Sequence, residues 1–141
     1  MDMIQCIYCS KSVDGELTAS ALDALLEQSR VNNAAIDVTG MLLYESGAFF
    51  QVLEGDREVV ERLYKRLERD PRHQGVIKLI VEPISERSFG SWSMGYPRVS
   101  REELAQIDGM NDFFSQGKSF LELEEGRAKT LLDAFKGGRW H

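Results

Sequence analysis

The stretch DVTGMLLYESGAFFQVLE, residues 37–54, contains two β-strand patterns joined by a tight turn. We expect the strands to be Asp37–Glu45 and Ala48–Glu54, since both are rich in aliphatic and aromatic residues. Ser46 and Gly47 separate them, and a two-residue connection that contains glycine is typical of a β-hairpin. The other elements can be assigned outward from this hairpin.

The chain before the hairpin provides one strand and one helix. Met3–Ser10 alternates around a short apolar core and predicts a strand. Thr18 is suited to cap the N-terminus of a helix that runs to about Asn33. Leu17 and Leu22 have the spacing of a hydrophobic staple at this end of the helix.

The chain after the hairpin provides a second helix and two strands. Asp56 can cap the helix, and Pro71 ends it. Val76–Ile84 and Phe89–Gly95 are typical of strands. The order β-α-β-β-α-β-β predicts an α+β fold, a ferredoxin-like sandwich in which two helices lie on one face of a mixed five-stranded sheet.

The last part of the chain predicts short helices. We divide the chain into a sandwich domain, residues 1–97, and a C-terminal helical extension, residues 98–141. Ser100 and Glu103 form a capping-box pattern, and Leu121–Phe135 predicts a further helix. We expect the extension to pack on the sheet or on a partner.

Composition excludes several classes of protein. The 141 residues carry a formal net charge of -6, which argues against a nucleic-acid-binding surface. No apolar run is long enough to span a membrane, and the N-terminus lacks the pattern of a signal peptide. Two cysteines are too few for a disulfide framework. We therefore expect a cytoplasmic protein.

Polar residues occupy positions where apolar ones are usual. Ser29 and Asn33 fall within the leucine stripe of the first helix, and Asn32 lies at its edge. Gln51 lies between two large apolar neighbours on one strand face. A buried amide without a partner costs about 1–3 kcal/mol, so these side chains need hydrogen-bond partners or a ligand. For Asn33, a helix C-cap is the alternative interpretation.

Two further strand patterns bear on Gln51. Tyr8 lies on one face of the first strand, and it can meet Gln51 if the first and third strands are neighbours. Trp92 and Met94 share a face of the last predicted strand, where core packing is the simplest interpretation.

The residues leave three other functions open to consideration. Cys6 and Cys9 match C-x-x-C, but their odd separation on a strand sends the sulfurs to opposite faces and disfavours a redox or metal site. A small ferredoxin-like enzyme, acylphosphatase-like or oxygenase-like, can use His73 or Glu54 as a general base. No nucleophile converges with either residue. A pure interaction module is the third alternative.

Four stretches together resemble the BLUF family, whose domains sense blue light using FAD. The resemblance covers roughly residues 3–96. The stretches are Ile7–Ser10; Ser29–Asn33 with Val38–Gly40; Phe50–Gly55; and Asp70–His73 followed by Trp92–Met94. Val38 and Cys6 depart from the family pattern, which usually has isoleucine and an aliphatic residue there.

The resemblance implies a flavin between the two helices, FAD with FMN as the alternative. Asn33 and Asn32 are implied to bind the polar edge of the ring, with Ser29 in support. Gln51 is implied to lie between the flavin and the Tyr8 hydroxyl. The last two implied cofactor-binding residues are Arg72 and His73, near the ribityl-phosphate end.

The resemblance also implies a function without catalysis. Light drives electron and proton transfer from Tyr8 and leaves Gln51 in a new hydrogen-bonding state. Trp92 and Met94 are implied to respond to that change. The signal then reaches a separate downstream protein or a homo-oligomer interface, and no membrane or nucleic acid takes part.

Overall fold

The computed structural model describes residues 2–12, 17–71, 73–90 and 92–136. Strands and helices alternate in the first part of the chain, and short helices follow in the second. The elements are β1 (Met3–Ser12), α1 (Ala19–Ala35), β2 (Thr39–Glu45), β3 (Ala48–Asp56), α2 (Arg57–Glu68), β4 (His73–Pro83), α3 (Arg101–Ala105), α4 (Asn111–Ser115), the 3-10 turn η1 (Phe120–Glu122) and α5 (Glu125–Phe135).

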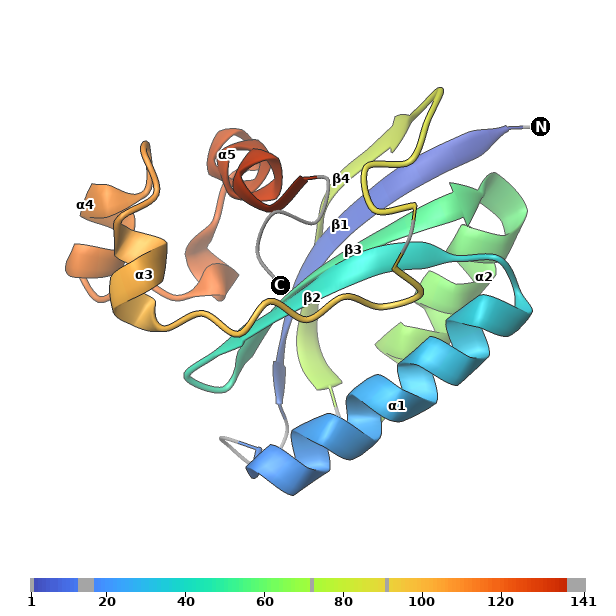
Figure 1. Ribbon diagram of the computed structural model, residues 1–141, viewed down its shortest axis with the longest axis horizontal. Coiled ribbons are helices and arrows are strands. Elements are labelled where there is room, and N and C mark those ends of the chain that lie inside the picture. Colours follow the sequence, from blue (N-terminus) through green and yellow to red (C-terminus); the bar gives the residue numbers. More distant parts are fainter. Residues whose placement is uncertain (1, 13–16, 72, 91, 137–141) are drawn as a thin grey trace.

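The sheet has the strand order β2-β3-β1-β4, and every neighbouring pair of strands is antiparallel. The predicted adjacency of the first and third strands is confirmed, and Tyr8 lies directly opposite Gln51 in their register. α1 and α2 lie on one side of the sheet, whereas α3, α4 and α5 lie on the other (Figure 1).

The prediction of a mixed five-stranded sheet was wrong. The described residues form four strands, and the described part of Phe89–Gly95 contributes only an isolated parallel bridge between Gly95 and Met41 of β2. This segment runs beside β2 (Figure 1). It does not continue as a strand because the Ser93 and Met94 carbonyls accept hydrogen bonds from α1 side chains.

The hairpin between β2 and β3 is confirmed at the predicted turn. Ser46 and Gly47 both have positive φ, 50° and 80°. Two consecutive residues in this region are the mark of a turn whose twist matches that of the flanking strands. The hairpin fixes Gln51 near the middle of β3, opposite Leu42 of β2.

The predicted helix starts are confirmed in position. Thr18 caps α1, and its hydroxyl accepts a hydrogen bond from the Ala21 N–H at 3.1 Å. Asp56 precedes α2 without a side-chain capping bond. Asn33 is not the C-cap of α1, because Ile36 takes that place and Asn33 is buried inside the helix.

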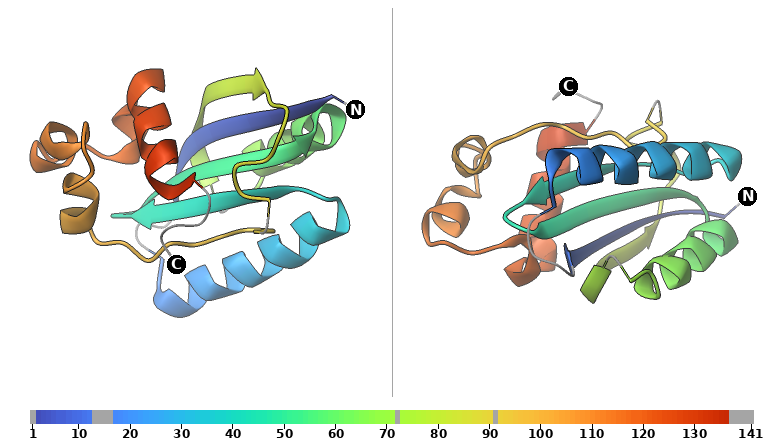
Figure 2. Two further views of the ribbon diagram at one scale, coloured as in Figure 1. Left: turned by 45° about the horizontal axis from the view of Figure 1, so that its top comes forward. Right: turned by 90° about the horizontal axis from the view of Figure 1, so that it is seen from below.

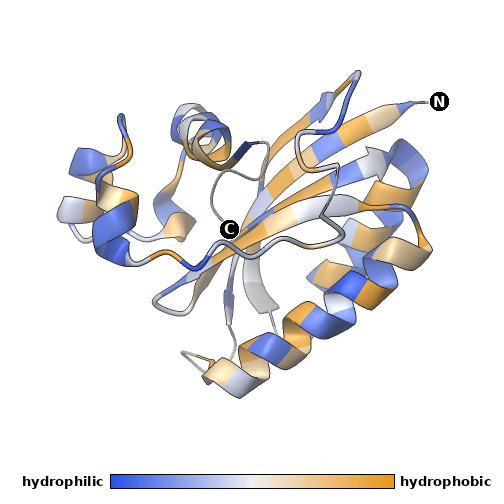
Figure 3. Ribbon diagram, in the orientation of Figure 1, coloured by the Kyte–Doolittle hydropathy of each residue, from blue (hydrophilic) through white to orange (hydrophobic). Residues whose placement is uncertain are grey.

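Helices cover both faces of the sheet (Figure 2), and an apolar core lies on each face. One core joins the sheet to α1 and α2, and the other joins it to the C-terminal helices. Hydrophobic residues dominate the strands in Figure 3, consistent with a sheet covered on both faces. Within the described residues, no helix has both the length and the apolar character needed to cross a bilayer.

The described part of the C-terminal extension, residues 98–136, packs on the sheet, which was one of the two predicted placements. Phe120 of η1 lies 5.9 Å from Phe50 of β3, measured between ring centroids. The capping box of Ser100 and Glu103 is confirmed at the start of α3. The sequence did not predict α4, and a 3-10 turn replaces the first part of the predicted helix Leu121–Phe135.

Glu54 is a fully buried carboxylate that anchors the loop after β4. It accepts hydrogen bonds from the Ser88 N–H at 2.8 Å and the Phe89 N–H at 2.9 Å. The Gln5 amide donates to it as well, at 2.9 Å. With its oxygens engaged in this way, Glu54 holds structure together and is not placed to act as a general base.

We expect Glu54→Ala to lower the free energy of unfolding by about 2–3 kcal/mol, because it leaves buried N–H donors without acceptors. Urea denaturation measures the change. Glu86 is exposed in the same loop, and Glu86→Ala should change stability by less than about 0.5 kcal/mol. Equal effects of the two substitutions would show that the Glu54 bonds carry no net stability.

Candidate functional site

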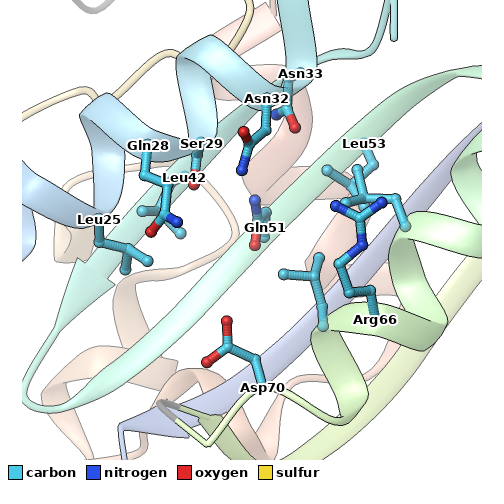
Figure 4. Close-up of a pocket in the computed structure, with 12 residues that line it drawn as sticks. Leu25, Gln28, Ser29, Asn32, Asn33, Leu42, Gln51, Leu53, Arg66 and Asp70 are labelled. Atoms are coloured by element: carbon cyan, nitrogen blue, oxygen red, sulfur yellow. The ribbon is translucent and has the colours of Figure 1, made fainter. Parts of the chain in front are cut away.

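A cavity of about 250 Å³ lies between α1 and α2, over β2 and β3. Leucines from both helices and both strands form its apolar walls, and amide, hydroxyl and charged groups point into it (Figure 4). The lining residues are Leu25, Gln28, Ser29, Asn32, Asn33, Leu42, Gln51, Leu53, Leu63, Arg66, Leu67 and Asp70.

Gln51 lies at the floor of this cavity and bridges two buried side chains. Its Oε1 accepts a hydrogen bond from the Tyr8 hydroxyl. Its Nε2 lies 3.6 Å from the Met94 sulfur, to which it donates. The predicted contact between Tyr8 and Gln51 is therefore confirmed, and so is the burial of the Gln51 amide.

Tyr8 is held as a neutral hydrogen-bond donor. The side chain is fully buried, and the loss of solvent raises the pKa of its phenol well above the usual value. Tyr64 of α2 packs edge-on against it, with ring centroids 5.5 Å apart. The Tyr8 hydroxyl donates its hydrogen bond to the Gln51 side-chain carbonyl oxygen.

The polar end of α1 faces the same cavity. Ser29, Asn32 and Asn33 all line it, and Asn33 is buried. The Asn33 Nδ2 donates to the Ser93 carbonyl at 2.9 Å, which leaves Oδ1 as an acceptor. The helix thus brings together Ser29 and Asn33, which the sequence placed within its apolar stripe, and Asn32, which it placed at the edge.

Trp92 and Met94 lie on opposite sides of the sheet, so the prediction that they share a face was wrong. Met94 is buried in the core on the α1 side, where it contacts Gln51. Trp92 packs with the other core and stacks on Phe89 at 5.8 Å between centroids. Alternation of faces holds for a regular strand, and this segment is not one.

Two predicted residues have no described side chain, and two residues that were not predicted lie on the α2 side of the cavity. Arg72 is outside the described residues, and His73 is described only by its backbone, as the first residue of β4. The sequence did not predict Arg66 and Asp70, which reach the cavity from the α2 side (Figure 4). Arg66 follows buried Leu63 by three positions, and this helical spacing was the available signal.

The two cysteines lie on opposite faces of β1, as predicted. Cys6 packs in the core on the α1 side and Cys9 in the other core. Burial raises the pKa of Cys6 to about 11 and that of Cys9 to about 12. Thiolate is the nucleophile and the metal ligand, so both groups act here as small apolar side chains.

The cavity fits a flat heteroaromatic ligand with hydrogen-bonding groups along one edge. Leucines such as Leu25 and Leu63 supply apolar contact for the faces of a ring. The amides of Asn32, Asn33 and Gln51 bring hydrogen-bonding groups to its edge. The volume of about 250 Å³ encloses a ring system and not a whole dinucleotide.

The chain matches a family of known proteins. The BLUF family, "Sensors of blue-light using FAD", matches residues 3–95. The structure "BlsA ground state" superposes with a TM-score of 0.78 at 32% identity, over 93% of this chain and 85% of that one.

Two curated proteins are also similar. The photoactivated adenylate cyclase subunit beta of Euglena longa is 36% identical over 83% of this chain, which spans only 14% of that protein's length. The blue light- and temperature-regulated antirepressor BluF of Escherichia coli is 34% identical over 92% of this chain and 32% of its own length. The chain thus belongs to the BLUF family of flavin-binding blue-light sensors.

Proposed function

We propose that this chain senses blue light through a hydrogen-bond network of Tyr8, Gln51 and a flavin bound in the cavity between α1 and α2. One observation carries the proposal. The Gln51 amide lies at the cavity floor, with a strong donor, the Tyr8 hydroxyl, at one end and a weak acceptor, the Met94 sulfur, at the other. A bound flavin supplies the absorption of blue light and an acceptor for an electron and a proton.

The Gln51 amide is suited to change state because one of its two contacts is weak. Breaking the hydrogen bond from Nε2 to the Met94 sulfur costs little free energy, because a thioether sulfur is a poor acceptor. If the amide turns over, Nε2 faces Tyr8 and donates to the phenol oxygen. A net hydrogen bond contributes only about 1 kcal/mol, so two amide orientations of similar free energy can coexist in this pocket.

The other residues hold the ring or shape its surroundings. We assign Asn33 and Asn32 to the polar edge of the ring, and Ser29 to their support. Arg66 and Asp70 lie on the α2 side of the same cavity and add a cation and an acceptor there. Arg72 and His73 stay assigned to the ribityl-phosphate end on the sequence pattern alone.

The signal leaves the site through the segment that bears Trp92 and Met94, which joins the cavity to the C-terminal extension, residues 98–141. Met94 contacts Gln51, and Trp92 belongs to the core formed with the C-terminal helices. We propose that the chain signals without catalysis of its own, through a change in association with another protein or with a second copy.

Illumination of the purified protein tests this function. We expect flavin absorption bands that shift to longer wavelength under blue light and return in the dark without net bleaching. A protein that holds flavin but shows no reversible shift contradicts the proposal. Turnover of a phosphate ester by a colourless protein favours the alternative, a ferredoxin-like enzyme.

We expect Asn33→Ala to retain less flavin than the parent chain. The loss of one directed hydrogen bond of about 1 kcal/mol weakens binding roughly fivefold. The ratio of flavin to protein absorbance after dialysis measures it. Asn111→Ala is a matched control, because Asn111 also donates to a backbone carbonyl, that of Ala105, but outside the cavity. Equal flavin retention in both variants would remove Asn33 from the binding site.

A further inference from the structure

The carbonyls of residues 92–95 show how this segment is attached. The Gly40 N–H donates to the Trp92 carbonyl at 2.9 Å, and the Leu42 N–H donates to the Gly95 carbonyl at 2.8 Å. The backbone of β2 therefore holds the two outer carbonyls. The two inner ones, of Ser93 and Met94, accept from α1 side chains instead.

Arg30 and Asn33 are those side chains. Arg30 Nε donates to the Met94 carbonyl at 2.9 Å, and Asn33 Nδ2 donates to the Ser93 carbonyl at 2.9 Å. Their spacing of three places them on one face of α1. They differ in one respect, because Asn33 lines the cavity and Arg30 does not. Of the two bonds from α1 to this segment, the Arg30 bond is therefore the one whose donor does not line the cavity and so is not available to a ligand there.

The position of the Met94 backbone matters because its side chain touches Gln51. Methionine has three rotatable side-chain bonds, so its sulfur stays in one place only where the backbone and the packing hold it. Gly95, the next residue, is packed closely against the Trp92 ring, which limits movement of the backbone here. A Cβ atom on Gly95 would lie 1.8 Å from the Trp92 ring, so the chain folds tightly at this point.

We propose that Arg30 is a positioning residue of the light response. It fixes the Met94 carbonyl and thereby keeps the Met94 sulfur against the Gln51 amide. Arg30 touches neither Gln51 nor the cavity and acts through Met94. This inference rests on the proposed function, since it matters to signalling only if Gln51 changes its hydrogen bonds there.

The test compares Arg30→Ala with Arg62→Ala, on the flavin-loaded protein. Arg62 is a matched control, because its Nε donates to a backbone carbonyl, that of Glu58, at 3.3 Å on the exposed side of α2. The first readout is amide hydrogen exchange in the dark, in the peptide that contains residues 92–96. We expect exchange there to be about tenfold faster in Arg30→Ala, which corresponds to 1.4 kcal/mol, and unchanged in Arg62→Ala.

The second readout is the rate at which the absorption shift decays after illumination. We expect Arg30→Ala to bind flavin and to shift, but to recover about fivefold more slowly, because the lost contact also stabilises the transition state for the return to the dark arrangement. Arg30→Lys keeps the charge and one donor, and it should fall between Arg30→Ala and the parent. If Arg30→Ala does not fold, Arg30→Lys alone is compared with the parent. Slower recovery in Arg30→Lys supports the inference, and unchanged recovery contradicts it.

The outcomes separate the two claims. If the parent chain shifts and Arg30→Ala matches Arg62→Ala in both readouts, the role of Arg30 is wrong and the proposed function stands. Faster exchange with unchanged recovery makes Arg30 a structural contact only and also overturns the inference. If the parent chain shows no shift, the proposed function fails, and the exchange result still reports whether Arg30 holds the segment.

Discussion

Gln51→Leu should bind flavin and lose the reversible absorption shift completely. The substitution removes both Oε1 and Nε2, so no group remains that can exchange donor for acceptor beside Tyr8. Leucine suits the apolar floor between Leu42 and Leu53, and the ring contacts made by the helices stay in place. The light-minus-dark absorption spectrum measures the effect.

Two variants complete this experiment. Tyr8→Phe removes the hydroxyl that donates to Gln51, and it too should keep flavin and lose the normal lit state. Gln28→Leu is the control, since Gln28 lines the same cavity from α1 and has no assigned part in the switch. A reversible shift in Gln51→Leu that equals the parent's would show that the amide is not the switching group.

Phe120→Ala should lower the free energy of unfolding by about 3–5 kcal/mol, the usual cost of truncating a buried phenylalanine. Phe120 is 1% exposed and lies against Phe50 of β3 and Phe114 of α4. Small domains have only about 5–15 kcal/mol in total, so this is a large share. Urea denaturation followed by far-UV circular dichroism measures it.

The same experiment reports whether the C-terminal extension folds together with the sandwich domain. Leu121→Ala is the control, because Leu121 is the half-buried neighbour of Phe120 in η1 and should cost less than about 1.5 kcal/mol. A single transition displaced to lower urea indicates one cooperative unit. Two separate transitions in the parent chain, with only one affected, would contradict it.

The elements built from local patterns could be predicted from the sequence. The hairpin needed only its turn residues, and the start of α1 needed only Thr18. The pairing of Tyr8 with Gln51 followed from one topological assumption, that the first and third strands are neighbours. The burial of Asn33 followed from helical spacing. For the hairpin, the start of α1 and the burial of Asn33, the deciding information lies within a few residues.

The errors arose where distant parts of the chain decide the structure. Phe89–Gly95 has the composition of a strand, but Arg30 and Asn33, about 60 positions away, bind its inner carbonyls. Trp92 packs against the core formed with the C-terminal helices. The residue pattern of a strand does not reveal that such a core lies next to it. In the sequence, Arg66 and Asp70 have the pattern of surface charges, and only the structure shows that they line the cavity.

The central claim is that light changes the hydrogen bonds of the Gln51 amide, and infrared difference spectroscopy tests it most directly. The protein is prepared with carbon-13 in the side-chain carbonyl of glutamine, and light-minus-dark spectra are recorded for the parent and for Gln51→Leu. We expect label-sensitive carbonyl bands in the parent that are absent from the variant. Difference bands that the label leaves unmoved, in a protein whose flavin absorption does shift, would contradict the account.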